Sequence, residues 1–469
     1  MDLTDLLFEC CRRAVRGGAT FADARSVDSA GLSLTIQDGR AERLSSHRSS
    51  GVGVRVLFGG AWGFASADGV SEPAIRQATE AAMAAARASA PACRDKAPLA
   101  DHPPIVAESI LPARRPLDDW SIPQKIARLT ELERAGVGAA EGFAVNSVLS
   151  YGEGRRTLHL ANSRGTRIVQ AMPHCRVVYS ITAVVDDVRQ QAHEVKAHLG
   201  GLDLLTELSP EQLSTKAATR AIRQCRSPTA PPGMMPIVFH PSITGLFAHE
   251  ALGHNAEADG YYAGQSILAG HLGQPIATPH VTIVDDSTIA GGYGSFAYDD
   301  EGVVSQRRTI IDRGVFTTLL HNLETAARFD APPNGCGRAE DHTAQPIVRM
   351  SNTFVAADPA GPSAEQMIRS IDRGLYLAEG QEGYVFPERG QFVCKADSAR
   401  RIEHGQLGEW LRDVSVSGLV LETLMRIEAV GSDFEMAAPG ACGKMGQNVP
   451  TDCGGPHVKI SEMVVGGEG

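Results

Sequence analysis

The chain has 469 residues, of which 43% are hydrophobic and 21% are charged, a composition typical of globular proteins. A net charge of −11 argues against a protein that binds nucleic acids in general or anionic membranes. The mean hydropathy is −0.12 and the chain has no long apolar run, which excludes a transmembrane helix. The nine cysteines are odd in number and scattered, and acidic rather than basic residues open the chain, so we expect a cytoplasmic protein without a disulfide framework.

The first part of the chain alternates between helix and strand patterns. An amphipathic pattern predicts a helix over residues 3–15, and glycine-punctuated stretches of alternating polarity predict an antiparallel meander over residues 21–67. Ser71 is a favourable N-cap for an alanine-rich helix that ends near Ser89. A proline-rich segment, residues 91–116, then predicts an extended connector.

Helix and strand patterns alternate again in the next segment. Ser121 and the proline that follows soon after it predict the start of another helix. Residues 143–199 alternate in polarity and predict a second set of strands, and residues 204–225 predict one long helix.

The segment Ser227–Pro236 is the best candidate for a domain boundary, because prolines and a glycine interrupt two periodic regions there. We therefore predict an α+β fold. It has an N-terminal α/β domain of antiparallel strands and helices, residues 1–230, and a C-terminal β-rich domain, residues 231–469, which carries the helix that contains residues 249–254. Hairpins dominate the second domain, with turns expected at 312–314 and 404–408.

The sequence HEALGH, residues 249–254, combines two histidines with a glutamate. Neutral imidazoles bind zinc, and a neighbouring glutamate can act as a general base. The histidines are five residues apart, which leaves their side chains roughly 140° apart on a regular α-helix. A shared face therefore requires a distorted turn, such as a π-bulge with i→i+5 geometry, and Gly253 is where the backbone is least hindered.

The same pattern occurs a second time as HEVKAH, residues 193–198. This copy lies in an alternating stretch that is typical of a strand. Five residues along a strand place His193 and His198 on opposite faces, so we expect an exposed polar strand there and not a metal site.

A catalytic zinc site needs three protein ligands and one open position, so two histidines leave one ligand to find. Glu257 and Asp259 lie just downstream of the hexapeptide, and Cys442, Cys453 and His457 lie together in a glycine-rich C-terminal segment. The residue types and spacings alone do not favour any one of these candidates as the third zinc ligand.

Several segments carry a resemblance to a known family. In chain order they are SSGVGVRVLFGGAWGFAS, FHPSITGLFAHEALGHNAEAD, DDSTIAGGYGSFAYDDEG, VRMSNTFV, and GACGKMGQNVP followed by VKISEMVVGG. Together they resemble the TldD/PmbA family of zinc metallopeptidases, and more closely its catalytic TldD branch, because the silent branch lacks the histidine–glutamate string. The resemblance extends over almost the whole chain.

The resemblance implies one zinc ion per chain, held by His249, His254 and Cys442, with Glu250 as the general base. It implies hydrolysis of peptide bonds in small or unfolded substrates. Some biosynthetic relatives act instead as amidases that remove an N-acetyl group, and a third reading is a regulatory subunit. Family members form dimers, so we expect a homodimer or a heterodimer with a catalytically silent PmbA/TldE-like paralogue, and neither nucleic acid nor a membrane as a partner.

The sequence identifies the residues that bind the substrate less specifically than it identifies the metal ligands. Stabilising the charge that develops on a carbonyl oxygen requires a donor, for which Tyr293, Tyr298, His321 and Arg349 are candidates. The resemblance adds Gly294 and Ser295, so the expected substrate-binding residues are Tyr293, Gly294, Ser295 and Arg349. Two acidic clusters could recognise an amine or could be solvated turns; their members are Asp285, Asp286, Asp299, Asp300 and Glu301.

Overall fold

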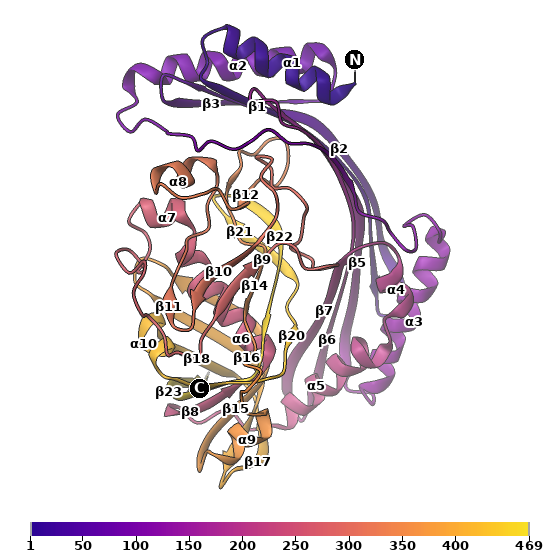
Figure 1. The fold of residues 1–469 in the computed structure, drawn as a ribbon. Helices are drawn as coiled ribbons and strands as arrows, with labels where there is room; N and C mark the ends of the chain where they lie inside the picture. Colours follow the sequence, from indigo (N-terminus) through magenta and orange to yellow (C-terminus); the bar gives the residue numbers. More distant parts are fainter. Residues whose placement is uncertain (1, 468–469) are drawn as a thin grey trace.

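The computed structural model describes residues 2–467, and its N-terminal half is an arch of long, curved strands (Figure 1). The strands of this sheet are β1 (Phe21–Gln37), β2 (Arg40–Phe58), β3 (Ala61–Asp68), β4 (Val106–Ile110), β5 (Ala144–Asn162), β6 (Arg167–Val185) and β7 (Val188–Leu199). They are ordered β3-β2-β1-β5-β6, and β4 and β7 pair with different parts of β6. The C-terminal half lies on the concave side of the arch.

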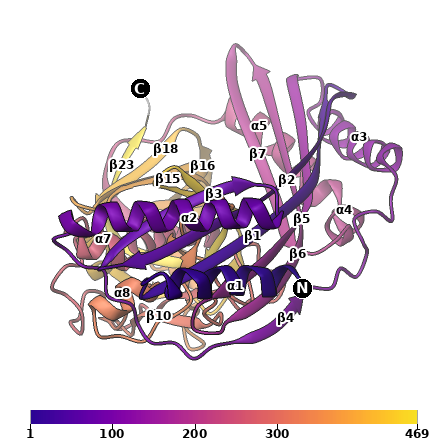
Figure 2. The same ribbon diagram turned by 90° about the horizontal axis from the view of Figure 1, so that it is seen from above.

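Helices cover the convex face of the arch. They are α1 (Leu3–Arg16), α2 (Glu72–Ser89), α3 (Ile122–Ala139), α4 (Asp203–Glu207) and α5 (Ser214–Arg226), with short 3₁₀ turns η1 (Ala90–Ala92) and η2 (Pro210–Gln212). Figure 2 shows α1 and α2 side by side over β1–β3. One apolar cluster joins α1 and α2 to β1 and β2, and a second joins α3 and α5 to β1, β5 and β6.

The antiparallel meander expected over residues 21–67 is confirmed, since β1, β2 and β3 pair in sequence. Gly39 and Gly60 occupy its turns with positive φ angles, whereas Gly31 and Gly51 lie within the continuous strands β1 and β2 and allow close approach. A Cβ on Gly31 would collide with the backbone oxygen of Glu153, and one on Gly51 would lie 2.7 Å from the oxygen of Ala67. The single helix expected over 204–225 is divided into α4, η2 and α5 around Pro210.

The C-terminal half contains two seven-stranded sheets. The first consists of β8 (Gly233–Phe239), β15 (Arg373–Phe386), β16 (Gln391–Glu403), β17 (Gln406–Leu411), β18 (Val414–Leu419), β19 (Ile427–Val430) and β23 (Val458–Gly467). Pairing between β15 and β16 closes β15, β8, β23, β18 and β16 into a ring.

The second sheet consists of β9 (Ile283–Asp286), β10 (Arg307–Asp312), β11 (Val315–Phe316), β14 (Asn352–Val355), β20 (Glu435–Met436), β21 (Gly440–Lys444) and β22 (Gln447–Gly455). A separate pair is formed by β12 (Gly337–Arg338) and β13 (Ile347–Val348). The helical elements are α6 (Pro241–Phe247), η3 (Ala248–Gly253), η4 (His254–Ala256), α7 (Ala258–Tyr262), α8 (Leu323–Arg328), α9 (Ala364–Arg369) and α10 (Val420–Met425).

The predicted α+β class is confirmed, and so is the hairpin turn between β10 and β11. Positive φ angles of 44° at Arg313 and 85° at Gly314 are typical of a type I′ turn. The turn expected over 404–408 is shorter, because β17 already begins at Gln406. The division at residues 230 and 231 stays a prediction. Among residues 2–467, no helix is long and apolar enough to cross a membrane.

Helix α6 lies in the core between the two C-terminal sheets. The Phe247 ring packs at 6.2 Å from that of Phe239 and at 5.0 Å from that of Phe392, both on the ring of strands. On the side facing β22, Gly245 leaves no room for a side chain, since a Cβ would lie 2.7 Å from the carbonyl carbon of Cys453. This close packing fixes where the chain enters the following turn.

We predict that Gly245→Ala lowers the free energy of unfolding by about 1–3 kcal/mol, because the methyl group overpacks the contact between α6 and β22. Gly138→Ala is the matched control: Gly138 is exposed in helix α3, and a Cβ there would meet nothing within 4 Å. The control should be neutral or stabilising by up to about 1 kcal/mol. Denaturant unfolding of both variants checks this, and equal effects would contradict it.

Candidate metal centre

The hexapeptide that contains both histidines adopts a π-helix. Element η3 covers Ala248–Gly253, and the backbone N–H of His254 donates to the oxygen of His249, which is the expected i→i+5 pattern. The two imidazole rings lie side by side, with centroids 5.3 Å apart and planes at 88°. Gly253 is required here, because a Cβ would collide with the sulfur of Met350. The sequence-based expectation of a distorted turn is confirmed.

The third side chain of the cluster comes from a different element. Strand β21 brings the buried Cys442 to within 3.4 Å of His254, measured from Sγ to Nε2. One ligand atom each from His249, His254 and Cys442 lies within 4.8 Å of the other two. Within the described part of the chain, no other group of three or more histidine, cysteine or acidic residues is close enough to hold a metal.

The other candidates for the third ligand have different contacts. The Sγ of Cys453 donates to the oxygen of Ala438 at 3.8 Å. His457 contacts Asp433 through Nδ1 at 2.6 Å and Tyr376 through Nε2 at 3.1 Å. The structure therefore leaves Cys442 as the side chain that completes the cluster.

Glu257 and Asp259 belong to the surroundings of the cluster. The carboxylate of Glu257 lies 3.1 Å from Nδ1 of His254, so that Nε2 of the same ring is directed toward Cys442. Lys444 lies between the two acids, with its Nζ 3.1 Å from Glu257 and 2.6 Å from Asp259. Burial would raise the pKa of Glu257, but the charges of Lys444 and His254 lower it to about 2. A carboxylate that orients a histidine in this way is typical of metal sites.

Charge within the cluster favours the ligand forms of the side chains. Burial alone would raise the pKa of the Cys442 thiol, but hydrogen bonds and charges of the two histidines lower it to about 4. The thiolate is the form of cysteine that binds zinc. Burial raises the pKa of Glu250, against the lowering effect of the two histidines. Among the residues described, none forms a hydrogen bond or ion pair with this carboxylate, which leaves it available.

Two cavities meet at His249 and Glu250. The smaller has a volume of about 370 Å³ and extends toward β6, β7 and α5 of the N-terminal half. The larger has a volume of about 810 Å³ and extends past Cys442 along the hairpin of β15 and β16. Gly383 and Ala441 line both. The carboxylate of Glu250 therefore lies midway along an extended cleft.

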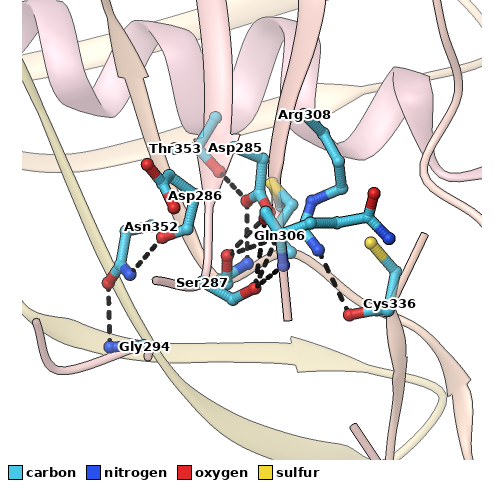
Figure 3. Close-up of polar contacts among 12 residues, drawn as sticks. Asp285, Asp286, Ser287, Gly294, Gln306, Arg308, Cys336, Asn352 and Thr353 are labelled. Atoms are coloured by element: carbon cyan, nitrogen blue, oxygen red, sulfur yellow. Dashed lines mark hydrogen bonds and ion pairs between the residues drawn. The ribbon is translucent and has the colours of Figure 1, made fainter. Parts of the chain in front are cut away.

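The expected substrate-binding residues are placed in buried networks instead. Gly294 donates its N–H to Asn352 Oδ1 at 2.9 Å (Figure 3). Asn352 also donates to Ser295 Oγ at 2.8 Å. Arg349 is fully buried and donates to the backbone oxygens of Cys442 and Gln447. Tyr293 is also buried. None of the four expected residues lines either cavity, so this geometry gives no support to direct substrate contact.

The two acidic clusters are neither solvated turns nor an exposed amine site. Asp285 accepts from Arg308 Nη2 at 2.6 Å and from Thr353 Oγ1 at 2.9 Å, inside the network of Figure 3. In the second cluster, Asp300 binds Arg156 of β5 at 2.6 Å. The physical reason is burial, since carboxylates in the interior require paired cations or donors.

The second histidine–glutamate string lies on β7, as expected. His198 Nε2 is 3.2 Å from the oxygen of Gly201, while His193 lines the smaller cavity. The strand is not simply exposed, because Glu194 is buried beside Lys216 and Arg220 of α5.

Sequence reasoning missed two residues that support the centre, Lys444 and Arg349. Lys444 follows Cys442 by two positions, and this short separation is the one feature of the sequence that places Lys444 near the centre. Arg349 was assigned to the substrate, although it holds the backbone of Cys442 from a segment 93 residues away.

We predict that Cys442→Ser strongly weakens zinc binding, because it replaces the only thiolate of the cluster. The loss should exceed the roughly 10–100-fold expected for removing a second-shell partner. Cys453→Ser and His198→Ala are the controls and should retain about one zinc per chain. Chelator competition with elemental analysis measures this. Loss of zinc in Cys453→Ser, with Cys442→Ser unaffected, would contradict the assignment.

Comparisons with known proteins agree along the chain. Three family models match: "PmbA/TldA metallopeptidase domain 1" over residues 22–86, "central domain" over 115–224 and "C-terminal domain" over 232–467. A "Metalloprotease" of Methanothermobacter thermautotrophicus is 37% identical, covering 95% of each chain. A "Zinc metalloprotease TldD homolog" of Saccharolobus solfataricus is 26% identical, covering 98% of this chain and all of the other. The crystal structure of TldE from Thermococcus kodakarensis has a TM-score of 0.77 at 18% identity, covering 99% of this chain and 100% of that one, and so shares the fold.

Proposed function

The chain belongs to the PmbA/TldA metallopeptidase family, and we propose that it is a zinc-dependent hydrolase of peptide bonds in small or unfolded peptides. The observation that carries this proposal is the convergence of two histidines and a cysteine beside Glu250, at the junction of two cavities. Relatives named as metalloproteases support the same class of reaction.

The residues of the cluster fit one zinc ion. Two imidazoles and a thiolate are ligands that zinc prefers, and three protein ligands leave a position open for catalysis. His249, His254 and Cys442 would hold the ion, with Glu257 orienting His254. Bound zinc would supply Lewis-acid chemistry at an amide carbonyl and at water.

Glu250 then acts as the general base and acid. Its carboxylate takes a proton from the attacking water and later gives that proton to the leaving amide nitrogen. Burial raises the pKa of this group, which makes the protonated form more accessible for the second step. The backbone of Ala441 and Gly383 borders the same space and leaves room for a substrate on both sides.

A cleft that extends to both sides of Glu250 favours a peptide over the alternative substrate, an N-acetyl amide, which has only a small group on one side of the bond. The third possibility is a regulatory subunit. Such a subunit would not need the carboxylate of Glu250, which has no partner, beside the cluster. We also propose a cytoplasmic location, because all nine cysteines are free.

We predict that Glu250→Ala lowers hydrolysis of unstructured peptides by about 10²–10⁴-fold while zinc content stays at one per chain, because the base is lost and the ligands remain. Glu462→Ala removes an exposed carboxylate on β23 and is the control, which should keep full activity. Mass spectrometry of peptide digests and elemental analysis provide the two readouts. Undiminished turnover in Glu250→Ala would refute the mechanism, whereas loss of zinc would show that Glu250 is a ligand.

We further propose that the protein acts as a dimer, either with itself or with a silent PmbA/TldE-like paralogue. The hairpin of β15 and β16 supports this proposal, because Tyr384 and Phe386 lie two positions apart on one face of β15 and are 55% and 48% exposed. Neighbouring large apolar side chains on a surface are typical of protein interfaces.

We therefore predict a dimeric mass by light scattering at micromolar concentration, and higher activity when a paralogue is added if the partner is a different chain. Phe386→Ser should shift the protein toward the monomer. A fully active monomer would contradict the proposal.

A further inference from the structure

Arg176 is a cation without a partner on the wall of the smaller cavity. It lies on β6 and shares this cavity with His249 and Glu250. Its Nε is buried and has no hydrogen-bond acceptor, and within residues 2–467 no carboxylate forms an ion pair with the guanidinium. Burying part of a charged group without an acceptor costs free energy. The arrangement therefore indicates that an acceptor comes from a ligand.

The sheet around Arg176 leaves space for such a ligand. Directly opposite residues on antiparallel strands share a face, and the neighbours of Arg176 are Gly152 on β5 and Ala197 on β7. A Cβ on Gly152 would meet nothing within 4 Å, and the next residue across the sheet is Ser33. Residues 175, 177 and 179 of β6 face the helices, so Arg176 faces the concave side and the C-terminal half.

Other charges on the same wall are already paired. Lys216 and Arg220 lie 3.1 Å and 2.8 Å from the same carboxylate oxygen of Glu194. Arg220 also lies 3.2 Å from Asp397.

Glu379 of β15 also lines the smaller cavity, and its carboxylate is bound to Arg223 and Ser398. Lys196 is a second cation of the wall for which the structure shows no ion pair. The N-terminal side of the cavity therefore presents unpaired positive charge.

We propose that Arg176 binds a carboxylate of the substrate and makes the enzyme selective for peptides with an acidic group on the β6–β7 side of the cleaved bond. The proposal rests on the proposed function, because it places the peptide in the cleft beside Glu250. A guanidinium is planar and forms paired hydrogen bonds to a carboxylate, which an ammonium group does not reproduce. The carboxylate is either the C-terminus of the peptide or an Asp or Glu side chain.

The test compares matched peptides. An unstructured peptide that the zinc-loaded enzyme cleaves is prepared with a C-terminal acid or amide, and with Glu or Gln at one position at a time. We expect kcat/KM to be about 10–100-fold higher for the form that carries the recognised carboxylate, as for a hydrogen bond to a charged group. Preference for the terminal acid identifies the C-terminus, and preference for Glu identifies a side chain. Equal rates for all pairs would overturn the proposal.

Variants assign the preference to this residue. Arg176→Gln should bring the ratio of kcat/KM for the acid peptide to kcat/KM for the amide peptide close to one, and Arg176→Lys should retain part of this ratio. Arg155→Gln is the matched control, since it removes an exposed arginine from β5 of the same sheet and Arg155 lines neither cavity. An unchanged ratio in a folded Arg176→Gln protein would overturn the assignment. If that variant does not fold, the acid-to-amide ratios of the wild type and of Arg176→Lys test the assignment, and equal ratios in these two proteins would overturn it.

The failure of this inference can be told from failure of the proposed function. If no peptide is hydrolysed, the proposed function fails, and calorimetric binding of the same acid and amide peptides to the zinc-loaded protein tests Arg176 separately. Tighter binding of the acid, lost in Arg176→Gln, supports the inference. Equal binding of both forms overturns it.

Discussion

The five-residue separation of His249 and His254 is the constraint on which the rest of the site depends. A regular helix would direct these side chains roughly 140° apart, so the backbone must widen to a π-helix to bring them together. A π-helix lacks the stability of an α-helix and requires support from its neighbours. That support comes from the close packing of Gly245 on β22 before the turn and of Gly253 on Met350 within it.

A second constraint holds the two halves of the molecule together. The carboxylate of Glu301 lies 2.9 Å from Arg55 of β2, and Asp300 lies 2.6 Å from Arg156 of β5; Arg55, Asp300 and Glu301 are buried. Burial, and then the charge of Glu301, raises the pKa of Asp299 to about 8, so this acid is held where a charge would be unfavourable. Such buried pairs contribute geometric specificity more than stability. They join strands β2 and β5 of the N-terminal sheet to the loop that carries Asp300 and Glu301.

The sequence predicts features that depend on neighbouring residues. The π-turn follows from a spacing of five, and the hairpin turn at 312–314 follows from the glycine between two stretches with a strand pattern. Features that depend on distant segments were missed. The sequence does not show that Gly31 makes room for β5, or that Arg349 binds the backbone of Cys442. Nothing local reveals which distant chain a side chain will meet.

Cleft geometry and cleft charge play different roles in this arrangement. In the proposed reaction, the cluster and Glu250 act on an amide group, which every peptide contains, so they would not distinguish one substrate from another. Selectivity must come from groups that meet the substrate away from the reacting bond. The smaller cavity joins a wall of the N-terminal sheet to the π-helical turn of His249, and Arg176, a half-buried cation of this wall, forms no ion pair with the described residues. An unpaired guanidinium penalises a neutral ligand more than an apolar surface would, so the selectivity proposed for this enzyme requires only a single residue on the arch.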